Sequence, residues 1–497
     1  MVIKCLELSI NKYNMSVKLK CLVLFFTVLP FLSQAQNCRC EKVYAETKMT
    51  VENNYAGWFD KINFDNVKRY RDWSETFKAK AMAITNDSLC VGVIKEWLSY
   101  FNDKQLTATY VSSAKAMSVK SASSSNIAAN KRAMDEAAIR KYLENNKNLD
   151  PIEGIFENDH YRLGISKVGD QLFQAVVLWS KNINQKPGEV KAVIRKEGKK
   201  YSAQFHNEDK LIAHPYTVQV VDNILDMEVM FLEKTAPQIK KKKDLFEYEM
   251  EHDKLAPSLT IKDGVAVFSF PSFDFNSEKQ TAFLIEKQAD QLKKTALWVV
   301  DLRDNSGGEK KVGSQLMKYL YTQPYVSYHS EMRMTPLNFD LWYRSQIKPG
   351  YSQLDPDAKR TIDAEMEVMK AHYGKNYNVS GKLSDTLAID EVLPYPQKVA
   401  LLINRNTKGS AEMFTLLARQ SKKVTVMGEN SGGSLDYSNV MTVNTVCPSI
   451  GLKMPINRQL WLEDFFSVDK AGIKPELVLK GSDWVGEAQN RLQTQVK

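Results

Sequence analysis

Long hydrophobic runs are nearly absent from this sequence. The densest apolar run, residues 21–32, is shorter than the roughly 20 apolar residues that a membrane-spanning helix needs, and no later stretch approaches that length. The 497 residues are nevertheless 43% hydrophobic and 10% aromatic, which is enough apolar surface for two or three packed domains. The composition therefore excludes a disordered or fibrous chain.

A strong charge imbalance is also lacking, because the formal net charge is only +9. The densest basic run, 240–243, is followed at once by acidic residues between 244 and 253, a pattern that favours a solvated linker or helix face. We therefore expect no nucleic-acid partner. No group of histidine, cysteine and acidic residues has the spacing of a metal site, so we expect neither a metal nor another cofactor.

Cysteine is scarce, and two of the six lie in an N-terminal leader. Lys18 and Lys20 precede the 21–32 run, and the small residues that follow predict signal-peptide cleavage after Ala35. We therefore expect an exported protein, periplasmic or secreted, with no transmembrane segment in the mature chain. The remaining cysteines are Cys38, Cys40, Cys90 and Cys447. A bridge from Cys38 or Cys40 to Cys90 is one option, but other pairings and free buried thiols remain open.

Hydrophobic periodicity divides the chain into four parts. After the leader, 1–35, a helical cap is predicted over 36–150, because its apolar residues recur at helical spacing. Residues 151–235 alternate apolar and polar residues in short runs, which predicts a β-rich insert. Residues 256–497 mix buried strand and helix patterns, which is typical of an α/β core. A segment rich in serine and alanine, 112–130, is expected to be a mobile loop.

Two stretches of the core have the same organisation. ALWVVDLRDNSGG, residues 296–308, and LLINRNTKGSAEMFTLLARQSKKVTVMGENSGG, residues 401–433, each begin with a β-branched apolar run that stops abruptly at polar and glycine residues. A helical pattern follows each stop. Each stretch is therefore predicted to contain a strand–loop–helix unit, and two such units indicate a layered core.

The loop sequences resemble those of the tail-specific, or C-terminal-processing, serine peptidases. The chain supplies DLRDNSGG at 301–308, TKGSAE at 407–412, GENSG at 428–432 and GIKPE at 472–476. The resemblance covers roughly residues 256–480. It implies a crotonase-like layered peptidase core, serine-type hydrolysis of peptide bonds, and a polypeptide or C-terminal peptide as ligand.

The same resemblance implies an oxyanion site at Gly307 and Gly308. Glycines let the backbone turn sharply after a strand and leave N–H groups near a helix N-terminus, where negative charge is stabilised. The amide that follows the nucleophile supplies the other donor. That amide belongs to Ala411 if Ser410 is the nucleophile.

The reacting groups depart from the family pattern. Gly409 stands where the family places its nucleophilic serine, and Ser410, one residue later, carries the nearest hydroxyl. The tricorn-like branch takes its base from a histidine in an N-terminal D-x-H motif, but Gln105 stands at that position here. An amide cannot accept a proton near neutral pH. Glu429, which the branch uses to orient the site, is therefore left without its imidazole.

Three functions remain open from the sequence. The first is an exported polypeptide-binding pseudopeptidase with weak or no hydrolysis. The second is an active serine-type peptidase that uses Ser410. The third is a noncatalytic scaffold whose β-rich insert binds a partner. The sequence gives no indication of the oligomeric state.

Overall fold

The computed structural model describes residues 38–110, 135–181, 185–206, 212–240, 243–274, 276–464 and 466–496. The expected leader with its cleavage site at Ala35, and the loop expected over 112–130, lie outside these residues. None of the helices in the described ranges has a run that is long and apolar enough to cross a bilayer.

The N-terminal region is helical, as its periodicity predicts. In α3 the buried residues Tyr70, Ser74, Phe77 and Ala81 recur every three or four positions, so one face of the helix packs inward. The elements of this helical cap are α1 (Cys40–Asn54), α2 (Trp58–Lys61), α3 (Val67–Met82), α4 (Asp87–Leu98), the 3-10 helix η1 (Ser99–Phe101) and β1 (Thr107–Tyr110).

The helical cap packs on a five-stranded sheet that contains its own β1. The sheet order is β1-β20-β14-β15, and β19 pairs on β20. The other strands are β14 (Ser330–Arg333), β15 (Asn376–Tyr377), β19 (Tyr437–Asn444) and β20 (Ile450–Gln459). Leu452 and Met454 of β20 are buried in the same apolar cluster as Trp97 and Phe101 of the cap. The cap is therefore folded onto residues from near the end of the chain.

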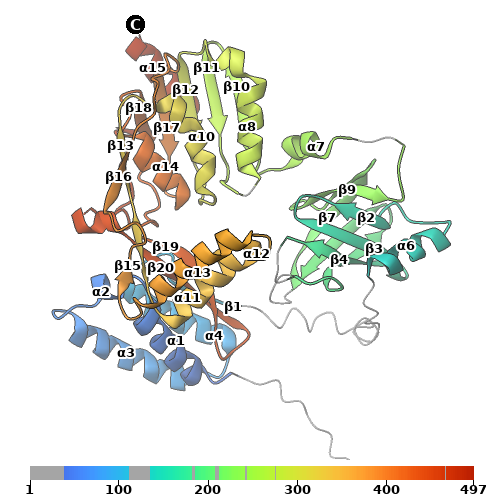
Figure 1. The fold of residues 1–497 in the computed structure, drawn as a ribbon, viewed down its shortest axis with the longest axis horizontal. Helices are drawn as coiled ribbons and strands as arrows, with labels where there is room; N and C mark the ends of the chain where they lie inside the picture. Colours follow the sequence, from blue (N-terminus) through green and yellow to red (C-terminus); the bar gives the residue numbers. More distant parts are fainter. Residues whose placement is uncertain are drawn as a thin grey trace, which may run out of the picture. The chain divides into compact units, whose positions relative to one another are not determined.

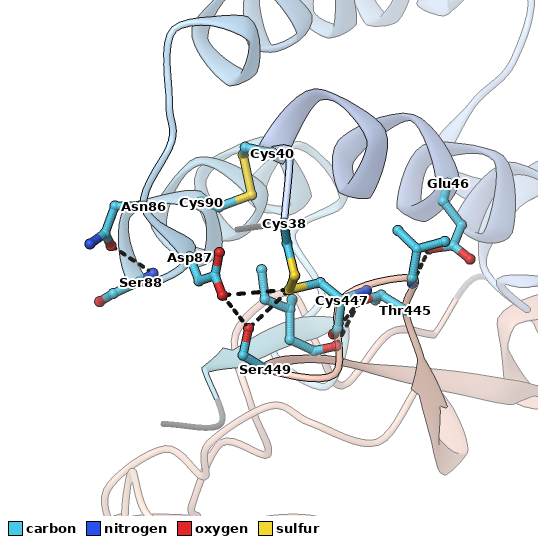
Figure 2. Close-up of a disulfide and its surroundings, with 12 residues drawn as sticks. Cys38, Cys40, Glu46, Asn86, Asp87, Ser88, Cys90, Thr445, Cys447 and Ser449 are labelled. Carbon is cyan, nitrogen blue, oxygen red and sulfur yellow. Dashed lines mark hydrogen bonds between the residues drawn. A yellow bond between two sulfur atoms is a disulfide. The ribbon is translucent and has the colours of Figure 1, made fainter. Parts of the chain in front are cut away.

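Two disulfides fasten this region (Figure 2). Cys40 at the start of α1 is bonded to Cys90 of α4, and Cys38 is bonded to Cys447 in the turn between β19 and β20. The Cys40–Cys90 pair is among the options that the sequence left open. The link from Cys38 to Cys447 was not singled out, since spacing along the chain does not show which turn the cap rests on.

The insert is a closed antiparallel barrel of eight strands. In β4 the inward positions Phe173, Ala175 and Val177 are almost fully buried, which is the alternation expected of a barrel strand. The strands are β2 (Gly154–Glu157), β3 (Tyr161–Gly169), β4 (Leu172–Ser180), β5 (Val190–Glu197), β6 (Lys200–His206), β7 (Ile212–Val221), β8 (Ile224–Asp226) and β9 (Phe231–Ala236). Helix α6 (Glu136–Asn145) packs on the barrel, and α7 (Leu245–His252) follows it.

The core is a six-stranded sheet in the order β10-β11-β12-β17-β18-β21. Every pairing in it is parallel except that of β10 with β11. The strands are β10 (Ser258–Lys262), β11 (Val265–Ser269), β12 (Leu297–Asp301), β17 (Lys398–Ile403), β18 (Val424–Gly428) and β21 (Leu477–Val478).

Helices cover both faces of this sheet (Figure 1). Successive residues of β12 point to opposite faces, so Trp298 and Val300 join one apolar cluster while Leu297 and Val299 join the other. The covering helices are α8 (Ser277–Lys287), α10 (Lys310–Leu320) and α14 (Ser410–Ala418) on one face and α15 (Trp484–Val496) on the other. The predicted α/β core, helical cap and β-rich insert are therefore confirmed.

Several helices of the core region are short or interrupted. The helical pattern of residues 278–294 is divided in the structure between α8 and α9 (Ala289–Leu292). Between β13 (Tyr325–Tyr328) and β16 (Ser384–Leu387) the chain makes a long excursion. Its helices are α11 (Pro336–Trp342), the π-helix η3 (Tyr343–Ile347), α12 (Lys348–Tyr351) and α13 (Pro356–Lys370). The 3-10 helix η4 (Leu460–Asp464) follows β20.

Candidate functional site

Three parallel strands of the core end at one edge, and each is followed by one of the loop motifs. β12 ends at Asp301, β17 at Ile403 and β18 at Gly428. The strand register pairs Asp301 with Leu402 and Ile403 with Gly428, so the three ends are level. Open α/β sheets bind ligands at the carboxyl ends of their strands. The three loops therefore form one candidate site.

The loop after β12 is fixed by a buried asparagine. Asn305 donates through Nδ2 to the Phe270 carbonyl and accepts at Oδ1 from the Gly307 N–H, both at 2.9 Å. Gly308 has no room for a side chain, because a Cβ would lie 1.9 Å from the Phe273 carbonyl oxygen. The Gly308 N–H has no acceptor among the described residues. The Gly308 amide is thus available to a ligand, whereas the Gly307 amide is already used.

The turn at Gly409 has the backbone shape of a nucleophile turn. Its φ of 58° and ψ of −125° form a combination that residues with side chains rarely adopt, and strained turns between a strand and a helix are where catalytic serines are exposed. A Cβ at this position would meet nothing closer than the Ser306 carbonyl oxygen at 3.6 Å and the Gly307 Cα at 3.7 Å. Packing therefore does not exclude a side chain at position 409.

Ser410, the candidate nucleophile, is the first residue of α14. Its Oγ donates to the Gly308 carbonyl at 2.8 Å. If Ser410 reacted, the following amide, that of Ala411, would have to stabilise the oxyanion, but this N–H donates to the Lys408 carbonyl at 3.2 Å. The N–H of Ser410 itself has no acceptor within the described part of the chain. The two available amides, on Gly308 and Ser410, therefore suit a reacting group at position 409 better than one at 410.

A buried glutamate joins this turn to the loop after β18. Glu412 is 0% exposed. Its Oε2 accepts from the N–H groups of Gly409 and Ser434, both at 3.0 Å. Its Oε1 accepts from the Ser431 hydroxyl at 2.6 Å and from the Gly433 N–H at 2.7 Å. Burial raises the pKa of this carboxyl, while the four hydrogen bonds oppose the shift. Glu412 thus holds both loops in one arrangement.

The helical cap brings Gln105 to the same loop. Its Nε2 donates to the Ser434 carbonyl, and its backbone N–H donates to Asp103 Oδ1 at 2.8 Å. The neighbouring Lys104 donates through Nζ to the Gly432 carbonyl. The position of the expected base therefore lies against the loop that the buried glutamate holds. The amide of Gln105 acts there as a hydrogen-bond donor.

Three carboxylates, those of Asp103, Asp436 and Asp469, are buried near the loop that follows β18. Asp469 accepts at Oδ1 from the N–H groups of Leu435 and Asp436, at 2.6 and 3.0 Å, while its buried Oδ2 has no partner among the described residues. Burial and the nearby charge of Asp436 raise the pKa of Asp469 to about 7. Asp103 accepts from the Tyr55 hydroxyl at 2.7 Å, and burial raises its pKa. The helical cap and the loop thus meet through acidic groups.

Glu429 does not join this network. Its carboxylate faces Arg405, with a shortest nitrogen-to-oxygen distance of 3.3 Å, and its side chain is 39% exposed. No contact among the described residues links it to Gln105 or Gly409. Its expected role in orienting a base therefore stays a prediction.

The structure adds residues that the sequence did not single out as site residues. Glu412 was quoted only as part of a motif, although its spacing of three residues from Gly409 is that of a helix capping box and indicates contact with the turn. Lys104 and Ser434 could not be found this way, because their contacts join residues more than 300 positions apart.

The histidines whose side chains have described contacts are engaged elsewhere. His252 stacks on Tyr248 and His372 on Tyr377, while His329 is paired with Asp385. Within the described ranges, the one group of potential metal ligands close enough together is Cys38, Asp87 and Cys447, and its two sulfurs form a disulfide.

Comparison with known families assigns the core. Residues 264–479 match the model of peptidase family S41. The resemblance inferred from the loop motifs is therefore confirmed for this segment, although the match does not test which residues react. No curated protein matches the sequence.

Several solved peptidase structures have a similar arrangement. Mature CPAF complexed with lactacystin is 12% identical, and the match covers 92% of this chain and 97% of that one with a TM-score of 0.43. The photosystem II D1 C-terminal processing protease is 12% identical, with 91% and 97% covered and a TM-score of 0.36. The tricorn protease is 9% identical, with 92% of this chain but 37% of the other covered and a TM-score of 0.40.

Proposed function

Because residues 264–479 match the model of peptidase family S41, we propose that the protein binds polypeptides at the carboxyl edge of its core sheet and hydrolyses them weakly or not at all. The observation that carries this proposal is position 409. Gly409 provides the strained turn and the open space of a nucleophile position but no reacting atom.

The chemistry of acyl transfer supports the loss of hydrolysis. The reaction needs a nucleophile and a base that takes its proton. Gln105 donates a hydrogen bond at the position of the base, and an amide does not accept a proton near neutral pH. The Ser410 hydroxyl donates to a backbone carbonyl, which cannot deprotonate it. Both components are therefore missing in this arrangement.

The parts that would hold a peptide are still present. The N–H groups of Gly308 and Ser410 are available and stand beside the turn at Gly409. Two such amides hold the carbonyl oxygen of a bound peptide in the same way that they would stabilise an oxyanion. The proposed ligand is accordingly a polypeptide segment in extended form.

We also infer that the protein is exported. The observation in favour is that all four cysteines between Cys38 and Cys447 are paired. Disulfides persist in oxidising compartments and are rare in the cytosol. Such pairing agrees with the leader expected over residues 1–35.

The catalytic part of the proposal is tested by labelling with a fluorophosphonate probe. We expect no labelling of the wild type and labelling of the double variant Gly409→Ser, Gln105→His, because the turn and the open space accept a serine. Wild-type labelling that disappears in Ser410→Ala would overturn the proposal and establish the rival function, a peptidase that uses Ser410.

The binding part is tested by two substitutions of one residue. Gly409→Ser and Gly409→Phe impose the same backbone strain, but only phenylalanine fills the space beside Gly308. We expect binding of an unfolded-protein peptide library to survive Gly409→Ser and to fall at least tenfold in Gly409→Phe. Equal binding by both variants would place the peptide elsewhere and contradict the proposed site.

A further inference from the structure

A cavity of about 370 Å³ opens between the barrel and α7. Its barrel side includes the aromatic rings of Tyr161, Phe205, Tyr216 and Phe231, together with His160 and Lys191. Phe205 and Tyr216 pack edge to face with ring centroids 5.4 Å apart. The volume lies within the range of small-ligand sites, and aromatic walls are typical of them.

Helix α7 is held firmly against the barrel. The Tyr248 hydroxyl donates to Asp226 Oδ2 at 3.1 Å. The fully buried Asn223 donates through Nδ2 to the Lys243 carbonyl at 3.0 Å and accepts from the Lys243 N–H at 2.6 Å. The cavity is therefore bounded by two elements with specific contacts between them.

Two carboxylates, those of Glu249 and Asp253, line the α7 side of the cavity. The Glu249 carboxylate has no hydrogen bond or ion pair among the described residues, and the Asp253 carboxylate accepts there only from the Leu255 N–H at 2.8 Å. Lys279, a cation near Glu249, is paired with Asp159 at 3.6 Å. Both carboxylates lie toward the C-terminal end of α7, where the helix dipole favours cations. This end of the helix is therefore electrostatically unfavourable as it stands.

Burial makes the charged forms of these two acids costly. Burial, followed by the neighbouring charge of Asp253, raises the pKa of Glu249 to about 7, and burial raises the pKa of Asp253 as well. Glu249 also lines a second, adjoining hollow of about 460 Å³. A cation entering this space would replace the missing partner.

The lysine that lines the cavity does not supply that partner. Lys191 lies over the Tyr161 ring at 4.4 Å, and its Nζ donates to the Tyr161 hydroxyl at 3.2 Å and to Gln185 Oε1 at 3.0 Å. Lys191 is thus held by contacts within the barrel wall.

We propose that this cavity binds a lysine or arginine side chain of a polypeptide. Glu249 and Asp253 pair with the cationic end, and the aromatic rings contact the methylene stem and the face of the charged group. The site lies on the insert and is separate from the residues around Gly409. It rests on the proposed function only in taking a polypeptide as the source of the cation.

The test measures peptide binding by calorimetry at pH 8 with the full mature chain. The probes are acetyl-Ala-Ala-Lys-Ala-Ala-amide, the same peptide with norleucine in place of lysine, and spermidine as a cation that is not a peptide. The variant is Glu249→Gln, Asp253→Asn. The matched control, Glu247→Gln, Glu251→Gln, removes the same charge from exposed positions on the same helix.

We expect the lysine peptide to bind the wild type and the control equally, and the cavity variant at least tenfold more weakly. The norleucine peptide should bind at least tenfold more weakly than the lysine peptide. Thermal unfolding of each variant verifies folding. Equal binding by wild type and cavity variant, no binding of the lysine peptide, or binding of spermidine alone would each overturn the proposal.

The Gly409→Phe variant separates this site from the core site. We expect it to keep full affinity for the lysine peptide, because position 409 is not part of the cavity. If the lysine peptide is lost in Gly409→Phe but kept in the cavity variant, the peptide is bound at the core and the inference fails while the proposed function stands.

Discussion

The two sides of the candidate site are built differently. The nucleophile turn belongs to the core sheet, and its backbone is fixed by the buried Glu412 through four hydrogen bonds. The other side of the site comes from the helical cap. It contacts the core through two long side chains, Lys104 and Gln105, which donate to backbone carbonyls.

The difference predicts which residues of the site the fold depends on. Glu412 and Asn305 are buried, so losing either would damage the fold itself. Side chains at positions 409 and 105 have no such role, since position 409 is open and Gln105 is half-buried. A substitution at either position should therefore disturb the fold less than one at Glu412 or Asn305. Each of the following experiments tests this difference between the two sides of the site.

The largest effect is expected at the turn itself. Glu412→Ala leaves four donors without their acceptor and should lower the free energy of unfolding by about 4 kcal/mol. Urea denaturation measures the change. Glu429→Gln is the matched control, because its exposed pair with Arg405 should contribute less than about 0.5 kcal/mol. A similar loss of unfolding free energy in both variants would contradict the structural role given to Glu412.

The second effect concerns how the helical cap is held. Replacing both members of the Cys38–Cys447 pair with serine should lower the free energy of unfolding by about 3 kcal/mol, a typical contribution of one disulfide. Cap helices should then show faster amide hydrogen exchange than the core sheet. Uniformly increased exchange across both regions would argue against a separately held cap.

The third effect is a pH dependence at the contact between the two sides. Asp469 has a pKa of about 7 in the folded protein, against about 4 when unfolded, so its ionised form is disfavoured by folding. Stability should therefore fall by roughly 2–3 kcal/mol as pH rises from 4 to 7, with no further loss from this group above its folded pKa. In Asp469→Asn this part of the slope should disappear. An unchanged slope would remove Asp469 as its source.

The smallest effect is expected for Gln105→Ala. Loss of one hydrogen bond from a half-buried side chain should cost less than about 1 kcal/mol. Thermal unfolding measures this loss of stability. A loss as great as that of Glu412→Ala would mean that Gln105 supports the fold as strongly as the turn at Gly409 does.

The sequence predicted elements and motifs better than contacts. Strand–loop–helix units around Asp301 and Gly409 could be found because strands and helices have distinct local periods, and parallel strands bring their ends together. The closure of the insert into a barrel was not predictable, since it depends on β2 pairing with β9 about 80 residues later. The contact of Gln105 with Ser434 depends in the same way on the docking of the cap.

The cavity acids show a second limit of sequence reasoning. Glu249 and Asp253 stand in an acidic run that resembles a solvated helix face. Their side chains are only partly exposed because the barrel packs beside α7. Sequence patterns do not distinguish a charge facing solvent from a charge facing a neighbouring domain.

The bond between Cys38 and Cys447 has a consequence for the order of assembly. Chains are made from the N-terminus, so Cys40 can meet Cys90 early, whereas Cys38 waits until the β19–β20 turn exists. During that interval Cys38 is an unpaired thiol two positions from a bonded one, and exchange between them is possible. The correct pairing of the cysteines in the cap helices therefore depends on the β19–β20 turn, which is synthesised long after them.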